Sequence, residues 1–190
     1  GHDMIYVCFD NEAYMNTGIQ RSSATPFGAS TTTAPPGVAS MGNKTWKKNL
    51  PEIMVAHNIP YVATACNSYP LDFMNKVQKA RSIQGPAYIH CLSVCPTGWR
   101  SPSEACIKMG RLAVETGVFP LYEVEYGKYR MTVSMPEKLR PIQDYIKHQG
   151  RFRHLTPEQI KASQDRTNLE YKKLLSKIEH SKSWSEMSAE

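Results

Sequence analysis

Three short apolar runs in the first half of the chain predict the strands of a buried sheet. They cover Ile5–Phe9, Pro60–Ala65 and Ala87–Leu92. Apolar residues recur at helical spacing over Leu71–Ile83, and an earlier helix is predicted over Trp46–His57. Continuous apolar strands that are linked through helices are typical of α/β proteins. The pattern therefore predicts a parallel sheet flanked by helices.

Helix starts and a strand pair are predicted in the second half. Ser101–Glu104 resembles a capping box and opens a helix that ends at Glu115 or Thr116. A second capping box at Thr156–Gln159 opens a polar helix to about Ile178, which we interpret as a solvated helix packed by one narrow apolar stripe rather than a docking helix. The other predicted elements are two paired strands and a short helix, over Phe119–Glu125, Tyr129–Val133 and Pro141–His148.

A polar turn directly follows the first predicted strand. Asp10, Asn11 and Glu12 supply side-chain oxygens at the carboxyl end of that strand, where ligands bind in open α/β sheets. Such oxygens suit a hard cation such as magnesium, although an ordinary Asn- and Gly-rich turn would look the same. The irregular stretch Asn16–Asn43 that follows is interpreted as a binding loop, with a flexible linker as the alternative.

Composition and charge narrow the class of protein to which this chain can belong. The hydrophobic fraction of 41% supports a folded core, and no apolar run is long enough for a membrane span. The net charge of +6 is spread thinly, without the aromatic-interleaved basic patch of a nucleic-acid-binding protein. Five scattered cysteines and no secretory-signal pattern predict a reducing, cytoplasmic location.

The stretch Asp10–Pro26 resembles the second half of the thiamine diphosphate motif of pyruvate:ferredoxin oxidoreductases, in particular their beta subunit. The resemblance extends through Cys95-Pro96-Thr97-Gly98-Trp99 and Gly150-Arg151-Phe152-Arg153-His154-Leu155 and covers most of the chain. It implies a thiamine diphosphate-binding fold, with residues 1–117 as the C-terminal portion of that domain and residues 118–190 as a C-terminal extension of a strand pair and helices.

The same resemblance assigns the site residues. Magnesium holds the cofactor diphosphate through the side chain of Asn11 and the backbone carbonyl of Ala13. Asn16 lies near the reactive thiazolium carbon, and the cofactor-binding set is completed by Thr17, Gly18 and Gln20.

Cys95 is implied to be the fourth cysteine ligand of a [4Fe–4S] cluster. From the residues alone, the spacing of Cys91 and Cys95 is only a weak metal-site signal, because two cysteines do not make a cluster site, and a buried thiol is the alternative for Cys95. Cys91 is expected in the core. His90 is interpreted as a hydrogen-bonded core or rim residue rather than a catalytic one.

The family's Gly-Asp-Gly motif and first three cluster cysteines are not found in this sequence. We therefore expect the chain to be the C-terminal part of a longer subunit, shortened or split, whose partner segments carry those residues.

The implied activity is oxidative decarboxylation of pyruvate to acetyl-CoA and carbon dioxide, with electrons passing through [4Fe–4S] clusters to ferredoxin. The expected partners are the other subunits, ferredoxin, pyruvate and coenzyme A. Two alternatives stay open. One is a related enzyme for branched-chain or other oxoacids, including oxalate. The other is a non-catalytic structural subunit of such a complex.

Overall fold

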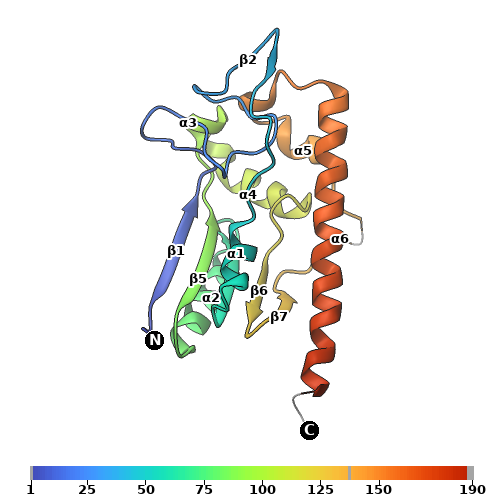
Figure 1. Cartoon of the computed structure of the whole chain (residues 1–190). Coiled ribbons are helices and arrows are strands. Elements are labelled where there is room, and N and C mark those ends of the chain that lie inside the picture. Colours follow the sequence, from blue (N-terminus) through green and yellow to red (C-terminus); the bar gives the residue numbers. More distant parts are fainter. Residues whose placement is uncertain (1, 137, 188–190) are drawn as a thin grey trace.

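The computed structural model describes residues 2–136 and 138–187 and contains one five-stranded sheet in the order β1-β5-β4-β6-β7 (Figure 1). Its strands are β1 (Ile5–Asp10), β4 (Tyr61–Cys66), β5 (Ala87–Leu92), β6 (Tyr122–Glu125) and β7 (Lys128–Met131). β1, β5 and β4 are parallel, as predicted. β6 and β7 form the predicted antiparallel pair, and β6 also pairs antiparallel with β4, so the whole sheet is mixed.

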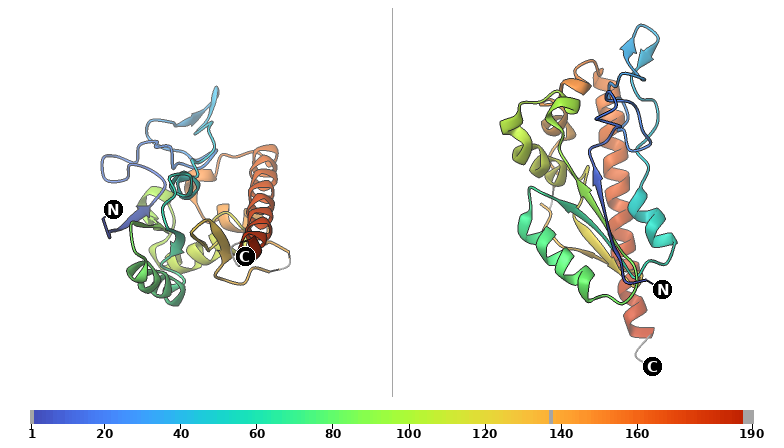
Figure 2. Two further views of the ribbon diagram at one scale, coloured as in Figure 1. Left: turned by 60° about the horizontal axis from the view of Figure 1, so that its bottom comes forward. Right: turned by 90° about the vertical axis from the view of Figure 1, so that its left-hand side faces the viewer.

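Helices cover both faces of this sheet. The helical elements are α1 (Leu50–Ala56), α2 (Pro70–Ser82), α3 (Pro96–Trp99), α4 (Cys106–Glu115), α5 (Ile142–Ile146), α6 (Pro157–Met187) and the 3₁₀ turns Ser103–Ala105 and Gly150–Phe152. Figure 2 shows α2 on one face, with α1 and α6 on the other. A small hairpin of β2 (Pro36–Gly37) and β3 (Ser40–Met41) lies within the long predicted loop. Neither this hairpin nor α3 was predicted.

The core is divided by the sheet into three apolar clusters. Ala63, Ile89 and Cys91 pack under α2, which confirms that Cys91 is a core residue. Val62 and Tyr122, on the opposite face, pack with residues of α1 and α6. The third cluster lies beyond the carboxyl ends of the parallel strands. It is built from Leu92, Trp99, Phe119, Phe152 and residues of α4 and α5.

Two predicted helix starts differ from the structure. Pro51 lies in the first turn of α1, so that helix begins at Leu50 rather than Trp46, and Pro51 starts it instead of kinking it. The predicted capping box at Ser101–Glu104 is wrong. The Ser101 backbone N–H donates to Pro96 O at 3.0 Å, so this residue closes the turn of α3, and its buried hydroxyl has no partner among the described residues. The next helix then starts without a side-chain cap.

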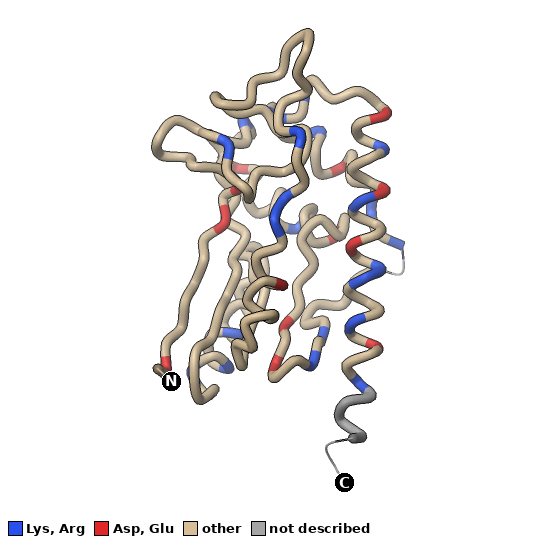
Figure 3. Tube along the Cα trace, in the orientation of Figure 1, with Lys and Arg blue, Asp and Glu red and all other residues tan. Residues whose placement is uncertain are grey.

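The capping box that opens α6 is confirmed. The Thr156 N–H donates to Gln159 Oε1 at 3.0 Å, and the Gln159 N–H donates to Thr156 Oγ1 at 3.4 Å. α6 continues to Met187, beyond the predicted end near Ile178. Basic and acidic residues interleave along it (Figure 3), with pairs such as Lys161–Asp165 at spacing i,i+4. Leu174 is buried against the sheet, as a narrow apolar stripe predicts.

β1 forms as predicted but is an edge strand in this chain. Tyr6 is 57% exposed and Phe9 68%, so the prediction of a buried strand is wrong here. None of the described helices is long and apolar enough to cross a membrane. The proposed division at residue 117 stays a prediction, and the β4–β6 pairing crosses it.

Glu123 on β6 is a buried carboxylate that accepts hydrogen bonds from three side chains. Its carboxylate accepts hydrogen bonds from Tyr61 Oη at 2.8 Å, Lys79 Nζ at 2.8 Å and Arg130 at 2.5 Å. Burial alone would raise the pKa of Glu123, but these three donors outweigh it and hold the pKa below the usual range. Ionised Glu123 therefore stabilises the fold.

We predict that Glu123→Gln lowers the free energy of unfolding at pH 7 by about 1–3 kcal/mol. Because the pKa of Glu123 is depressed in the folded chain, its contribution is present above the unfolded pKa of about 4.3 and disappears as the pH falls through the folded pKa. The variant should therefore lose less stability on acidification than the wild type. Urea denaturation from pH 7 to pH 3 tests this. Glu125→Gln, at a carboxylate that is 40% exposed, is the matched control, with an expected change below about 1 kcal/mol. Equal losses for the two variants would contradict the prediction.

Candidate functional site

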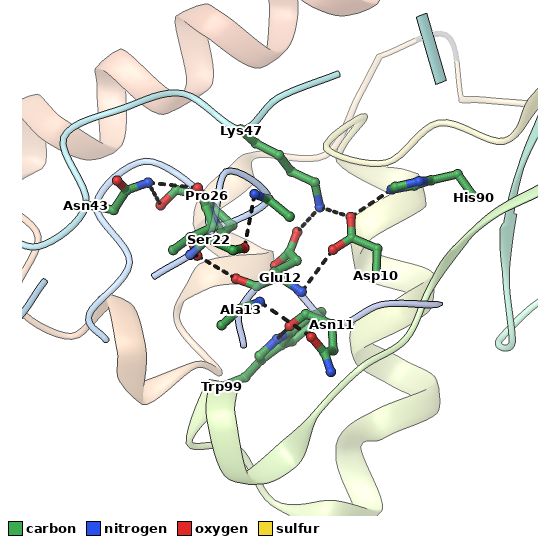
Figure 4. Close-up of polar contacts among 12 residues, drawn as sticks. Asp10, Asn11, Glu12, Ala13, Ser22, Pro26, Asn43, Lys47, His90 and Trp99 are labelled. Carbon is green, nitrogen blue, oxygen red and sulfur yellow. Dashed lines mark hydrogen bonds and ion pairs between the residues drawn. The ribbon is translucent and has the colours of Figure 1, made fainter. Parts of the chain in front are cut away.

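The turn after β1 has an unusual backbone. Glu12 adopts a positive φ of 71° although it is not glycine. Its N–H donates to Asp10 Oδ1 at 2.9 Å, and the Ala13 N–H makes a long contact of 3.5 Å with Asn11 Oδ1 (Figure 4). Within the described chain, no protein group donates a hydrogen bond to the carbonyl oxygen of Ala13. The turn therefore presents an amide side chain and a free carbonyl beyond the end of the strand.

Buried charges surround this turn on its inner side. Lys47 Nζ lies 2.5 Å from Asp10 Oδ2 and 2.8 Å from Glu12 Oε1. Arg151 donates to Glu12 Oε2 at 2.5 Å, and His90 Nε2 lies 2.8 Å from Asp10 Oδ2. The side chains of Asp10, Glu12, His90 and Arg151 are all less than 5% exposed. Two buried carboxylates are thus matched by two cations, the buried Arg151 and the partly exposed Lys47.

Electrostatics keep Asp10 and Lys47 ionised. Burial would raise the pKa of Asp10, but the ammonium of Lys47 and the hydrogen bond from His90 hold the pKa well below its usual range. Burial would lower the pKa of Lys47, but Glu12 and Asp10 raise it. Because an ionised carboxylate only accepts hydrogen bonds, Nε2 of His90 carries a proton. In the neutral ring, Nδ1 then accepts from Tyr88 Oη at 2.7 Å. The interpretation of His90 as a hydrogen-bonded core residue is confirmed.

The next segment folds back as a small hairpin. Tyr14 and Gln20 exchange backbone hydrogen bonds at 2.9 and 3.0 Å, and Thr17 Oγ1 donates to Gln20 Oε1 at 2.9 Å. Asn16, Thr17 and Gly18 are exposed at its tip, and Gly18 has a positive φ of 115°. The structure thus gathers these predicted cofactor-binding residues in one short hairpin directly after the turn.

Side-chain hydrogen bonds hold the rest of the long loop. Asn43 is buried and donates to the carbonyls of Thr25 at 2.7 Å and Thr45 at 2.9 Å, while its own Oδ1 accepts from Arg21 Nε at 2.7 Å. Thr25 Oγ1 in turn donates to the carbonyl of Glu12 at 2.8 Å. The loop is therefore tied to the turn by specific bonds that a flexible linker would lack.

The predicted cluster cysteine lies beside the same turn. Cys95 caps α3, and its Sγ accepts from the Gly98 N–H at 3.5 Å. Gly98 leaves room for Met15 of the hairpin, because a Cβ there would come within 2.1 Å of the Met15 sulfur. Trp99, at the end of α3, donates from Nε1 to the carbonyl of Asn11 at 2.9 Å. α3 thus contacts both the turn and the hairpin.

The motif Gly150–Leu155 contacts the other two motifs through Arg151. Its guanidinium lies 4.1 Å from the ring centre of Trp99 and 4.9 Å from that of Phe152, and its Nε donates to Gln149 Oε1 at 2.9 Å. The segments around residues 12, 99 and 151 therefore form one site, although 139 residues separate Glu12 from Arg151.

Sequence reasoning missed the charged partners of this site. Lys47 was not singled out, and Arg151 was quoted only as part of a motif and without a role. Local spacing does not link either residue to Glu12, which is 35 positions from Lys47 and 139 from Arg151. The chemistry offered by the turn is hard oxygen donors, with one thiol nearby. Among the described residues, no group of three His, Cys, Asp or Glu side chains could hold a metal ion by itself.

Comparison with known proteins gives consistent matches. The family described as "Thiamine pyrophosphate enzyme, C-terminal TPP binding domain" matches residues 1–91. Pyruvate synthase subunit PorB of Methanocaldococcus jannaschii is 58% identical over 164 residues, 86% of this chain and 55% of that protein. Ketoisovalerate oxidoreductase subunit VorB of Pyrococcus horikoshii is 50% identical over 86% of this chain and 53% of that protein.

Among solved structures, a chain of 2-oxoglutarate:ferredoxin oxidoreductase from Magnetococcus marinus matches with a TM-score of 0.48 and 21% identity. The match covers 84% of this chain and 57% of that chain. This chain spans about half the length of the curated relatives that it matches.

We predict that the contact between Met15 and Gly98 couples the hairpin to α3. Gly98→Ala should destabilise the protein by about 1–3 kcal/mol, because the new methyl group displaces the Met15 side chain. Met15→Ala should remove much of that cost, so the double variant should be less destabilised than the sum of the single variants. A double-mutant cycle by thermal or urea unfolding measures this coupling. Gly37→Ala, where a Cβ meets nothing within 4 Å, is the control. Strictly additive effects would show that the contact is not formed.

Proposed function

We propose that this chain is part of the beta subunit of a pyruvate:ferredoxin oxidoreductase, because it is 58% identical to pyruvate synthase PorB subunits over most of its length. The proposed reaction is oxidative decarboxylation of pyruvate to acetyl-CoA and carbon dioxide, with electrons leaving through [4Fe–4S] clusters to ferredoxin. The activity would belong to the assembled complex, since this chain spans only about half of its relatives. The other subunits, ferredoxin and coenzyme A are the proposed partners.

The single observation that carries the proposal is the turn Asn11–Ala13. Its free carbonyl at Ala13 and the amide oxygen of Asn11 are the hard ligands that Mg²⁺ takes up beside phosphate oxygens. The turn lies beyond the carboxyl end of a parallel strand, where α/β sheets bind ligands. We propose that these two groups hold magnesium, and through it the diphosphate of thiamine diphosphate.

The hairpin is proposed to line the same cofactor. Asn16 would act at the reacting carbon as a hydrogen-bonding group, and Thr17, Gly18 and Gln20 would shape the binding surface. When bound, thiamine diphosphate supplies the carbanion-stabilising chemistry that decarboxylation of a 2-oxoacid requires. The protein's part is placement. The hydrogen bond between Thr17 and Gln20 keeps the tip of the hairpin in position.

Cys95 is proposed as one thiolate ligand of a [4Fe–4S] cluster, with the other three ligands outside this chain. Support comes from its partial exposure and from its contact, through Gly98 and Met15, with the proposed cofactor hairpin. In contrast, burial raises the pKa of the Cys91 thiol to about 12, which makes Cys91 a poor ligand.

Ketoisovalerate is the alternative substrate. The similarity to VorB, at 50% identity, favours keeping a branched-chain oxoacid as the second candidate beside pyruvate. Rates of ferredoxin reduction with pyruvate, 2-ketoisovalerate and oxalate, measured with the assembled complex, would decide between these substrates.

We predict that Asn11→Ala in the assembled complex weakens the binding of magnesium and thiamine diphosphate together, because one oxygen ligand is lost from a cation that needs near-octahedral coordination. Asn16→Ala should mainly lower the turnover number and leave cofactor affinity near the wild-type value. Titration of thiamine diphosphate at limiting magnesium measures the first effect. Unchanged affinity in Asn11→Ala would show that this assignment is wrong.

We predict that Cys95→Ser lowers both the iron content of the complex and ferredoxin reduction, since a serine oxygen replaces a soft thiolate poorly at iron. Thiamine diphosphate should still bind, because the turn is untouched. Cys106→Ser, at another half-buried cysteine, is the control. If Cys95 were only a structural thiol, Cys95→Ser would cost about 1–3 kcal/mol of stability. Iron per complex and the reduction rate would then both stay at the wild-type level.

A further inference from the structure

Every polar group of Glu12 has a partner inside the protein. Its N–H donates to Asp10 Oδ1, its carbonyl accepts from Thr25, and its two carboxylate oxygens meet Lys47 and Arg151. The side chain is 2% exposed, and the backbone is in the left-handed region, which non-glycine residues rarely adopt. A residue in this conformation persists only when its surroundings over-determine it. The surroundings of Glu12 therefore set the shape of the turn.

Lys47 fixes the turn from one side by bridging the two carboxylates that flank Asn11. Its Nζ lies 2.5 Å from Asp10 Oδ2 and 2.8 Å from Glu12 Oε1. Because both neighbours point toward Lys47, the Asn11 side chain is directed away from it (Figure 4). One ammonium group thus determines the side of the turn on which the Asn11 amide lies.

Arg151 also fixes the turn, by two routes. It pairs directly with Glu12 Oε2 at 2.5 Å. It also stacks on Trp99, whose indole N–H donates to the carbonyl of Asn11 at 2.9 Å. The guanidinium therefore holds the Glu12 side chain directly and supports the Asn11–Glu12 peptide unit through Trp99. Its planar fork allows this, since Nε is held by Gln149 while a terminal nitrogen reaches Glu12.

We propose that Lys47 and Arg151 are positioning residues for the cofactor metal. They orient the Asn11 amide and the Ala13 carbonyl without contacting the metal themselves. The inference rests on the proposed function, because the metal is the magnesium proposed there. The ion pairs also leave the inner side of the turn electrically balanced, with two carboxylates against two cations. Asn11 and Ala13 can then present neutral oxygens at a fixed geometry. Outer partners that orient the ligands of a metal often change its affinity when they are removed.

The test is binding of Mg²⁺ and thiamine diphosphate to the assembled complex, measured by calorimetry without substrate. Lys47→Met and Arg151→Met should each raise the magnesium concentration needed for half-maximal cofactor binding by about 10–100-fold. Lys47→Arg, which keeps a cation able to bridge both carboxylates, should recover most of the affinity. Lys48→Met, at the exposed neighbouring lysine, is the matched control and should bind like the wild type.

A purely structural role predicts a different result. The melting temperature would fall in Lys47→Met while the magnesium dependence stayed unchanged, and this would overturn the proposal. If the complex does not assemble with Lys47→Met or Arg151→Met, the Glu12→Gln variant is measured in their place. This variant keeps the shape of the side chain but removes the ion pairs that Glu12 makes with Lys47 and Arg151. Wild-type magnesium dependence in it would equally overturn the proposal.

Failure of the proposed function is a separate outcome. In that case neither the wild type nor any variant would bind the cofactor in a magnesium-dependent way. If Asn11→Ala weakens binding while the Lys47 and Arg151 variants do not, only the positioning role is wrong.

Discussion

The candidate site depends on the paired burial of Glu12. A carboxylate in the interior is destabilising unless its charge and its lone pairs are satisfied, and removing one partner of a buried pair is strongly unfavourable. Here the partners come from distant segments of the sequence. Lys47 follows the loop Asn16–Asn43, and Arg151 lies in the 3₁₀ turn Gly150–Phe152. Satisfying this single carboxylate therefore brings three parts of the chain together and forces the backbone of the turn into its left-handed conformation.

The same arrangement explains why the three motifs form one site. Trp99 is the common element, because it stacks on Arg151 and donates to the carbonyl of Asn11. Cys95 is the N-cap residue of α3, so the thiol is held at a fixed place relative to the turn. Met15, packed into the space that Gly98 leaves, adds the hairpin to the assembly. The oxygen donors of the turn and the thiol of Cys95 thus come from different elements, and the contacts of Trp99 and Met15 hold these elements together.

Much of the framework could be predicted from sequence, because local patterns determine it. The apolar runs at Ile5–Phe9 and Ala87–Leu92 and the capping box at Thr156 all form the predicted elements. The resemblance pointed to the turn and to Cys95, and their roles in the site stay predictions. The failures have physical causes. Ser101 matches a capping pattern, but its backbone is used by α3. β1 has a buried-strand pattern but lies at a sheet edge here. Lys47 and Arg151 contact Glu12 from distant positions in the sequence, and local residue spacing does not predict such contacts.

The central claim is that the turn Asn11–Ala13 holds the cofactor metal in the geometry set by Glu12. The most direct measurement is a crystal structure of the intact complex with Mn²⁺ in place of Mg²⁺, in which anomalous scattering locates the metal. The account predicts one strong peak about 2.0–2.2 Å from both the Asn11 side-chain oxygen and the Ala13 carbonyl oxygen, with Lys47 and Arg151 still paired to Glu12. A manganese peak bound elsewhere, with these two oxygens uncoordinated, would contradict it.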